Sequence, residues 1–344
     1  MKNTLFFSLV SILLLFSCSK ENSTAQQDWL IPVEEVRDGG PGKDGIPSID
    51  NPQFVKVSEV NFLDDNDLVV GMVHNGVAKA YPHPILDWHE IVNDEIDDRQ
   101  VALTYCPLTG TAIAWNRNIE GQSTTFGVSG KLYNSNLIPY DRASDSYWSQ
   151  ANLNCVNGER IGTVIEIFPI LETTWGNWKN LYPNSDVLST QTGFSRDYMV
   201  YPYGDYRTNN SNILFPINPS DNRLPAKERV LGVLHKGSNK VYSINRFDTP
   251  QIISDQLGGD DLMIIGSRTL NFIVAFHKHA DLGTLSFKND SLPIVASDDL
   301  GNEIDITGKV ISGPLAGTQL NQPNAFIGYW FTFGAFYPGI DIYQ

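Results

Sequence analysis

Short runs of apolar residues, separated by turn residues, recur along this chain and predict β-strands. The run at 68–74 is followed by Asn75-Gly76 and then by a second run at 77–81. Asn-Gly is the favoured turn of a two-residue β-hairpin, so this segment is predicted to form a hairpin. Further strands are predicted at 101–105, 111–115, 124–128 and 132–140.

Two short helices are predicted between strands of the first half. Proline suits the first turn of a helix, and the apolar residues that follow Pro84 share one face, which predicts a helix from Pro84 through Asn93. Two tryptophans three residues apart predict a second helix over 173–181. In the second half, the segment 328–336 is its predicted counterpart.

The pattern occurs twice along the chain. The segment 70–81 returns at 231–242, a shift of 161 positions, and the shift shortens to 155 where Trp175 aligns with Trp330. We therefore expect a β-rich α+β fold of two homologous tandem domains, with short helices and a long connecting arm. The expected bounds are 29–183 for the first domain, 184–228 for the arm, which has no counterpart, and 229–344 for the second domain.

The N-terminus has the layout of a bacterial lipoprotein signal peptide. Residues 1–17 start with the basic Lys2 and continue as an apolar run that is too short to span a bilayer. Cys18 stands where such proteins are lipidated, for example with palmitate, and 18–28 is predicted to be a polar tether. The mature protein is therefore expected to be anchored to a membrane of the cell envelope, on its periplasmic or surface face.

Composition limits the classes of function. The formal net charge is −15 and no stripe of lysine or arginine offsets it, so nucleic acid is not an expected partner. With 344 residues, 41% of them hydrophobic, the chain can bury one large core or two ordinary ones, and the repeat favours two. Only Cys106 and Cys155 follow Cys18, which excludes a framework of disulfides and leaves a single disulfide between these two open.

The two copies differ at the residues that can carry chemistry. At the shift of 161, His83, His89 and Cys106 align with isoleucine, proline and serine, so a reactive site is expected in the first copy. By contrast, His74 and His235 occupy equivalent positions. We assign these two histidines to the common fold.

Cys106 is the leading candidate for a reactive residue. A thiol acts as a nucleophile or a metal ligand only as the thiolate. If His83 or His89 converges on Cys106, sulfur with imidazole suits copper, zinc or haem iron, or else forms a Cys-His nucleophile pair. The alternative is a structural role for all three residues, because free cysteine and hydrogen-bonded histidine are also common in protein cores.

A polar and aromatic stretch later in the first copy adds further candidates. Arg142 could meet either a ligand carboxylate or Cys106. Ser129, Tyr133 and Trp148 are candidate contacts for a sugar, a peptide or a planar cofactor. The segment around Ser129 lacks the glycine spacing of a nucleophile elbow, so a serine hydrolase is not expected.

Several longer motifs match a known family. They are Asp44-Gly45-Ile46-Pro47, His89-Glu90-Ile91-Val92-Asn93-Asp94, Thr104-Tyr105-Cys106-Pro107-Leu108, Phe126-Gly127-Val128-Ser129-Gly130, Tyr140-Asp141-Arg142 and Trp148-Ser149-Gln150. Together they resemble the bacterial family called domain of unknown function 3179, over nearly the whole chain after the tether. The resemblance implies an exported or lipid-anchored protein without a settled activity. The family commonly reads Cys-Pro-Leu-Cys-Gly where this chain has Thr109 as the fourth residue, so a site that needs two thiolates would lack one sulfur.

Three functions remain open from the sequence. The favoured one is an exported lipoprotein that binds a soft metal or a metal-containing cofactor through Cys106, His83 and His89. The first alternative is a thiol-dependent enzyme in which Cys106 is the nucleophile, a histidine is the base and Arg142 assists. The second alternative is a non-catalytic interaction protein of the cell envelope, so whether the protein is an enzyme is left open.

Overall fold

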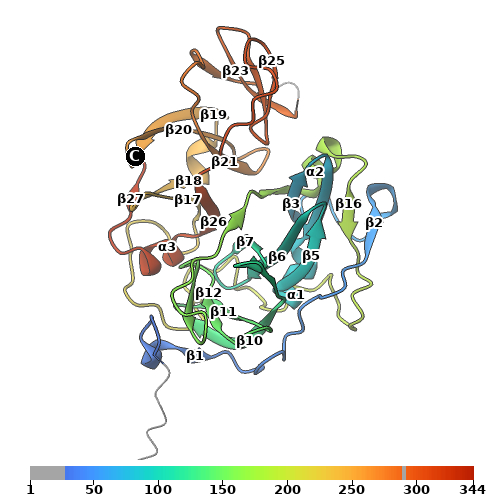
Figure 1. Cartoon of the computed structure of the whole chain (residues 1–344), viewed down its shortest axis with the longest axis vertical. Helices are drawn as coiled ribbons and strands as arrows, with labels where there is room; N and C mark the ends of the chain where they lie inside the picture. Colours follow the sequence, from blue (N-terminus) through green and yellow to red (C-terminus); the bar gives the residue numbers. More distant parts are fainter. Residues whose placement is uncertain (1–27, 289–291) are drawn as a thin grey trace, which may run out of the picture.

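The computed structural model describes residues 28–288 and 292–344, in which strands predominate over helices (Figure 1). Within these residues the α-helices are α1 (His83–His89), α2 (Trp175–Leu181) and α3 (Trp330–Phe336). The short 3-10 helices are η1 (Val33–Glu35), η2 (Val57–Glu59) and η3 (Ile244–Phe247). None of the described helices is long and apolar enough to cross a membrane. The predicted signal peptide at 1–17 and the predicted lipidation site Cys18 lie outside the described residues.

The first half of the chain forms three main sheets and one small ribbon. Their strand orders are β15-β3-β4-β16-β2, β14-β7-β6-β5, β1-β10-β11-β12-β13 and β8-β9. In chain order the strands are β1 (Arg37–Asp38), β2 (Phe54–Lys56), β3 (Leu68–His74), β4 (Val77–Pro82), β5 (Ile91–Ile96), β6 (Arg99–Cys106), β7 (Thr111–Asn116), β8 (Asn118–Ile119), β9 (Gln122–Ser123), β10 (Phe126–Tyr133), β11 (Asn136–Asp141), β12 (Tyr147–Ser149), β13 (Asn154–Asn157), β14 (Ile167–Phe168), β15 (Leu171–Thr174) and β16 (Asp186–Leu188).

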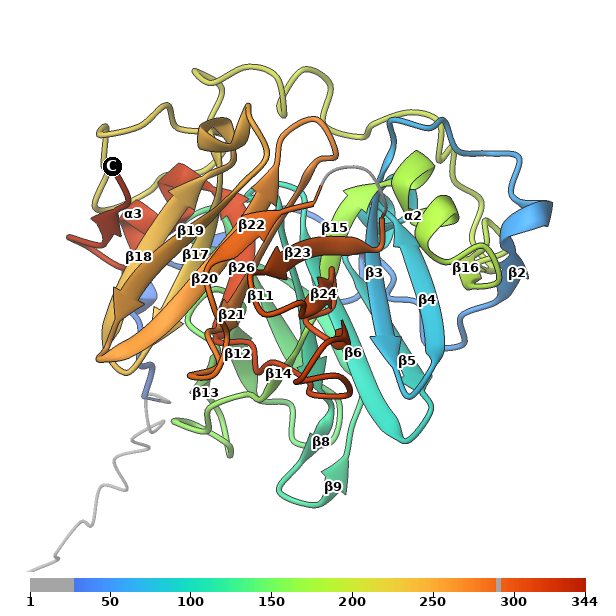
Figure 2. The ribbon, with the colours of Figure 1, turned by 90° about the horizontal axis from the view of Figure 1, so that it is seen from above.

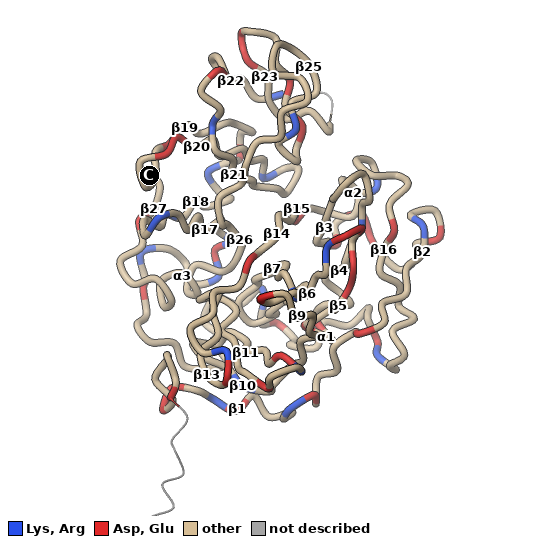
Figure 3. The backbone as a smooth tube through the Cα atoms, in the orientation of Figure 1, with Lys and Arg blue, Asp and Glu red and all other residues tan. Residues whose placement is uncertain are grey.

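The second half of the chain forms three further sheets. Their strand orders are β26-β17-β18-β27, β19-β20-β21 and β22-β23-β24-β25. The strands are β17 (Arg229–His235), β18 (Ser238–Ser243), β19 (Gln251–Leu257), β20 (Asp260–Ser267), β21 (Phe272–His277), β22 (Leu285–Phe287), β23 (Ile294–Asp298), β24 (Glu303–Asp305), β25 (Val310–Ser312), β26 (Asn324–Tyr329) and β27 (Asp341–Ile342). Charged residues of both signs are spread over both halves (Figure 3).

The predicted hairpin is confirmed. Strands β3 and β4 pair antiparallel from Val69 to the turn at His74↔Val77. Asn75 and Gly76 occupy the turn with positive φ angles of 48° and 81°, which is the backbone that a tight two-residue hairpin requires. Strands β17 and β18 form the equivalent hairpin in the second half.

Two predicted elements have different bounds in the structure. The helix predicted from Pro84 through Asn93 is wrong at its C-terminal end, because α1 ends at His89 and Glu90 adopts a left-handed backbone with φ of 59°. The β-branched residues that follow join β5 and pair with β6 instead. The strand predicted at 132–140 is divided by a turn at Asn134 and Ser135, which separates β10 from β11.

A glycine lies beneath an aromatic ring in both hairpin sheets. A Cβ atom on Gly71 of β3 would lie 1.9 Å from ring carbon Cζ3 of Trp178 on α2. A Cβ atom on Gly232 of β17 would lie 2.0 Å from ring carbon Cε1 of Phe333 on α3. In each half, the missing side chain lets a helix pack directly against a strand.

The halves share their apolar cores. One buried cluster joins Trp115 and Trp148 of the first half with Val230 and Trp330 of the second. A second cluster joins Trp178 with residues of β20 and β21, and Figure 2 shows strands of the two halves running alongside one another. The described chain is thus held together across the predicted domain boundary.

Candidate functional site

Cys106 is buried at the C-terminal end of β6. Its thiol lies 3.6 Å from the carbonyl oxygen of Ser135, to which it donates. Burial, and then the nearby Glu90 carboxyl, raise the pKa of this thiol to about 11, so the neutral thiol predominates at neutral pH. Both Cys106 and Cys155 are free.

His89, at the end of α1, uses both ring nitrogens in hydrogen bonds. Nδ1 donates to the carbonyl oxygen of Pro47 at 2.7 Å, which leaves Nε2 to accept from the Tyr198 hydroxyl at 2.7 Å. Burial is the main reason that the pKa of His89 is lowered. The imidazole therefore links the N-terminal segment to the connecting arm.

His83, at the start of α1, points toward a different set of residues. Its Nε2 lies 3.3 Å from Oε2 of Glu172, and its ring centroid lies 4.7 Å from that of Tyr105. Among the described residues, the groups of three or more side chains that could hold a metal ion do not include Cys106, His83 or His89. The structure does not bring the three into one ligand set.

The candidates between Ser129 and Trp148 belong to the packing around the β10–β12 sheet. Arg142 pairs with Asp44 and Asp50, at 3.1 and 3.3 Å. Other contacts in this region join the Ser129 hydroxyl to the Ile138 carbonyl, the Tyr133 ring to Phe336, and the buried Trp148 indole to Asp141. None of these contacts reaches Cys106.

A group of buried ionisable side chains lies where α1, the arm and the second half meet. We call it the buried ionisable cluster. Its members are His83, Asp87, Glu90, Tyr105, Glu172 and Arg229, with Tyr201, Tyr203 and Tyr329 around them. Arg229 lies on β17 and Tyr329 on β26, so both halves contribute to it.

Two carboxyls of this cluster have pKa values raised toward neutrality. Burial raises the pKa of Asp87 to about 6, although electrostatic interactions with His83 and Arg207 oppose the shift. Burial also raises the pKa of Glu90 to about 7, against the hydrogen bond that its Oε1 accepts from Tyr203 at 3.3 Å. In contrast, burial lowers the pKa of His83 to about 3, so this imidazole is neutral.

Glu172 and Arg229 connect the two halves by an ion pair in which the carboxylate is buried and the arginine side chain is 23% exposed. Nη2 of Arg229 meets Oε1 of Glu172, and Nη1 of Arg229 donates to Oδ1 of Asn271 at 3.1 Å. Within the described residues, the buried Asp87 Oδ1 has no hydrogen-bond partner. His83 Nε2, the two Glu172 carboxyl oxygens and Arg229 Nη2 contact one another, but without hydrogen-bond geometry. Buried polar atoms in native proteins are nearly always hydrogen-bonded, so these atoms mark a place for water or a ligand.

Sequence reasoning recognised only one member of this cluster as a site residue. His83, Asp87 and Glu90 are spaced by four and three residues, which places them on one face of a helix, and this spacing was a usable signal. Glu172 and Arg229 carry no such local signal, because their proximity depends on how the halves pack.

Comparison with known proteins adds a family. A family model described as a protein of unknown function, DUF3179, matches residues 43–340. No curated protein and no solved structure matches this chain.

Proposed function

The chain belongs to the DUF3179 family, whose function is unknown, and we propose that its buried ionisable cluster binds a small molecule that donates hydrogen bonds. The observations that carry this proposal are the buried acceptor Asp87 Oδ1, which has no hydrogen-bond partner, and the buried Glu172 oxygens, which contact Arg229 and His83 without hydrogen-bond geometry. A ligand with hydroxyl or amino groups would satisfy them. The surrounding tyrosine rings offer apolar faces to such a molecule.

The same site is suited to acid–base chemistry. The pKa values of about 6 for Asp87 and about 7 for Glu90 lie close to neutral pH, where a group can both take up and release a proton. Paired titratable groups shifted in this way are common at catalytic sites. We propose that the two carboxyls exchange protons with the bound ligand.

The geometry supports this function better than it supports the two hypotheses for Cys106. A thiol must ionise to act as a nucleophile or as a metal ligand. With a pKa of about 11 and its thiol directed at a carbonyl oxygen, Cys106 is held in the neutral form.

A thermal-unfolding screen of the full chain tests ligand binding. The panel consists of neutral monosaccharides, polyols and primary amines, and at least one member is expected to raise the midpoint, since a ligand at about 100 times its Kd stabilises by about 2.7 kcal/mol. Asp87→Asn and Glu172→Gln should abolish the shift, whereas Glu95→Gln, whose side chain is 62% exposed, should keep it. A panel without effect on the parent, or a shift that persists in Asp87→Asn, would refute the proposal.

The raised pKa of Glu90 predicts that the stability of the protein depends on pH. Its pKa is 4.5 in the absence of the fold and about 7 in the protein, so the folded state retains a proton that the unfolded chain has lost. Glu90 therefore lowers the free energy of unfolding as the pH rises from about 4.5 to 7. The difference in free energy of unfolding between Glu90→Gln and the parent is therefore expected to depend on pH. It should favour the variant by about 2 kcal/mol more at pH 8 than at pH 5. Urea denaturation at both pH values measures this difference.

Comparison with the parent isolates the contribution of Glu90. The lowered pKa of His83 gives a pH dependence of opposite sign, but it is present in both proteins and cancels. Glu95→Gln should show a much smaller difference between the two pH values. An equal effect of Glu90→Gln at pH 5 and pH 8 would mean that this carboxyl is not shifted.

We also propose that the protein is exported and lipid-anchored through Cys18. The support is the signal-peptide pattern of residues 1–17 and the cysteine that follows it. Mass spectrometry of the mature N-terminus tests this proposal, and an unmodified Cys18 would exclude the anchor.

We further propose that the two halves, 29–183 and 229–344, arose by internal duplication. The supporting features are the two hairpins of equal register and the two glycines beneath aromatic rings, Gly71 and Gly232. A survey of related sequences tests this proposal, and relatives that retain the glycine in only one half would weaken it.

A further inference from the structure

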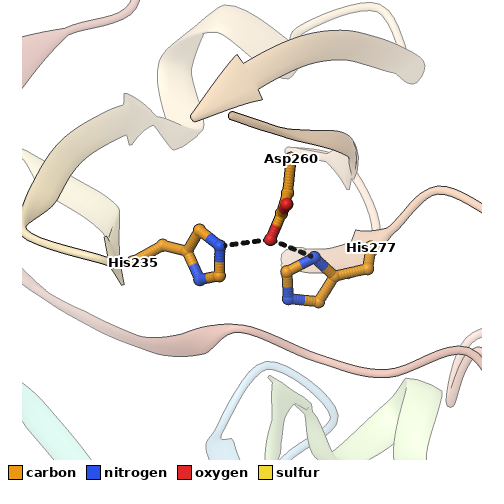
Figure 4. A group of neighbouring side chains, drawn as sticks. All are labelled: His235, Asp260 and His277. Atoms are coloured by element: carbon orange, nitrogen blue, oxygen red, sulfur yellow. Dashed lines mark hydrogen bonds and ion pairs between the residues drawn. The ribbon is translucent and has the colours of Figure 1, made fainter. Parts of the chain in front are cut away.

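Three strand ends of the second half meet at one edge, away from the buried ionisable cluster. His235 ends β17, Asp260 begins β20 and His277 ends β21 (Figure 4). The distance from His235 Nε2 to Asp260 Oδ2 is 2.7 Å, and that from His277 Nδ1 to the same oxygen is 4.0 Å. One ligand atom from each residue lies within 4.8 Å of the other two.

We infer that His235, Asp260 and His277 bind a divalent transition-metal ion. Two imidazoles and one carboxylate form a ligand set that suits zinc, iron(II) and related ions. Ligand atoms around a tetrahedral zinc lie about 3.3 Å apart, given bonds of about 2.0 to 2.2 Å. The distances of 2.7 and 4.0 Å to Asp260 Oδ2 lie on either side of this value, so shifts of less than about 1 Å would complete the geometry.

The three side chains are partly exposed, which gives solvent ligands access to a bound ion. The side chains of His235, Asp260 and His277 are 14%, 35% and 27% exposed, so each of them is reached by solvent.

Lys236 competes with a metal for the same carboxylate. Its Nζ lies 2.8 Å from Asp260 Oδ2, and its side chain is 58% exposed. Because this side chain is long and open to solvent, it can leave Asp260 when an ion enters. Substitution of Lys236 is therefore expected to strengthen metal binding.

The first half provides an internal control. At the shift of 161, the positions of His235, Asp260 and His277 are occupied by His74, Arg99 and Asn116. His74 instead contacts Asp98 at 2.7 Å, and this carboxylate side chain is 75% exposed. His74, Asp97 and Asp98 also lie close enough to hold an ion, but they supply one imidazole and two exposed carboxylates. Transition metals are expected to prefer the site with two imidazoles.

Cobalt(II) and zinc(II) titrations of the chelator-treated, tag-free full chain test the inference. We expect one equivalent of Co²⁺ to give visible absorption without a sulfur charge-transfer band, and one equivalent of Zn²⁺ to displace it. His235→Ala and His277→Ala should each weaken binding by about tenfold or more. Lys236→Gln should strengthen binding severalfold, and His74→Ala should leave it unchanged.

Two results would overturn the inference. One is the absence of stoichiometric metal binding by the parent and by Lys236→Gln, which retains all three ligands. The other is binding that survives His277→Ala or is lost in His74→Ala. Thermal unfolding of each variant in the presence of chelator shows whether it is folded, and Asp260→Asn replaces any histidine variant that is not. Neither result depends on Asp87 or Glu90, so failure here is distinct from failure of the proposed function.

Discussion

Replacing Arg229 with glutamine is expected to lower the free energy of unfolding by about 3 to 5 kcal/mol. Glu172 is buried, and Arg229 is the cation that pairs with it. Without the guanidinium, the Glu172 carboxylate would remain in the interior with no counter-charge, and this uncompensated charge is the source of the loss. Urea denaturation at pH 7 measures it.

A second substitution separates the buried charge from the lost packing. In the Arg229→Gln background, Glu172→Gln is expected to recover much of the stability, because a neutral amide costs less to bury than a carboxylate. Arg223→Gln is the matched control. This arginine pairs with Asp221 near the surface, where loss of an ion pair costs about 0 to 1 kcal/mol. A loss for Arg229→Gln no larger than that of the control would show that the ion pair does not hold the halves together.

Truncation of Trp178 to alanine is expected to destabilise the protein by about 3 to 5 kcal/mol. The indole is fully buried, its Nε1 donates to Ser185 at 2.9 Å, and its ring lies directly over Gly71. The substitution opens a cavity between helix and strand and leaves the Ser185 hydroxyl without this donor. Urea denaturation measures the loss, and Trp29→Ala, which removes a partly exposed indole, should cost less.

The contact between Trp178 and Gly71 can be tested by a double-mutant cycle. Gly71→Ala alone is expected to cost about 1 to 3 kcal/mol or more, because the added methyl would overlap the indole. In the Trp178→Ala background the same substitution should cost much less, since the obstructing ring is absent. Additive effects of the two substitutions would exclude the close packing described for this pair.

Local sequence signals predicted the β3–β4 hairpin well, but they predicted the end of α1 and the break between β10 and β11 poorly. The hairpin at Asn75-Gly76 depends on two turn residues and the runs beside them, so a short segment is sufficient to predict it. The end of α1 has no glycine or proline. Glu90 adopts the left-handed backbone there because Ile91 and Val92 are buried in β5, and this cause lies outside the helix.

The candidate sites were harder to predict because their residues are distant in sequence. Glu172 and Arg229 are close only because β15 and β17 belong to sheets that pack together. Comparing the two predicted copies directed attention to Cys106 and set His235 aside, because His74 occupies the aligned position. The same comparison applied to Asp260 and His277 would have identified residues present only in the second half.

The sharing of apolar clusters between the halves constrains how the sequence can change over time. Backbone contacts cross the boundary as well, for example from the amide of Tyr329 to the carbonyl of Thr109 at 2.8 Å. In a densely packed interior, a change of size at Trp330 must be matched by residues of the other half that fill the same cluster. The second half therefore remains under selection through the first, even at positions where it carries no reactive residue.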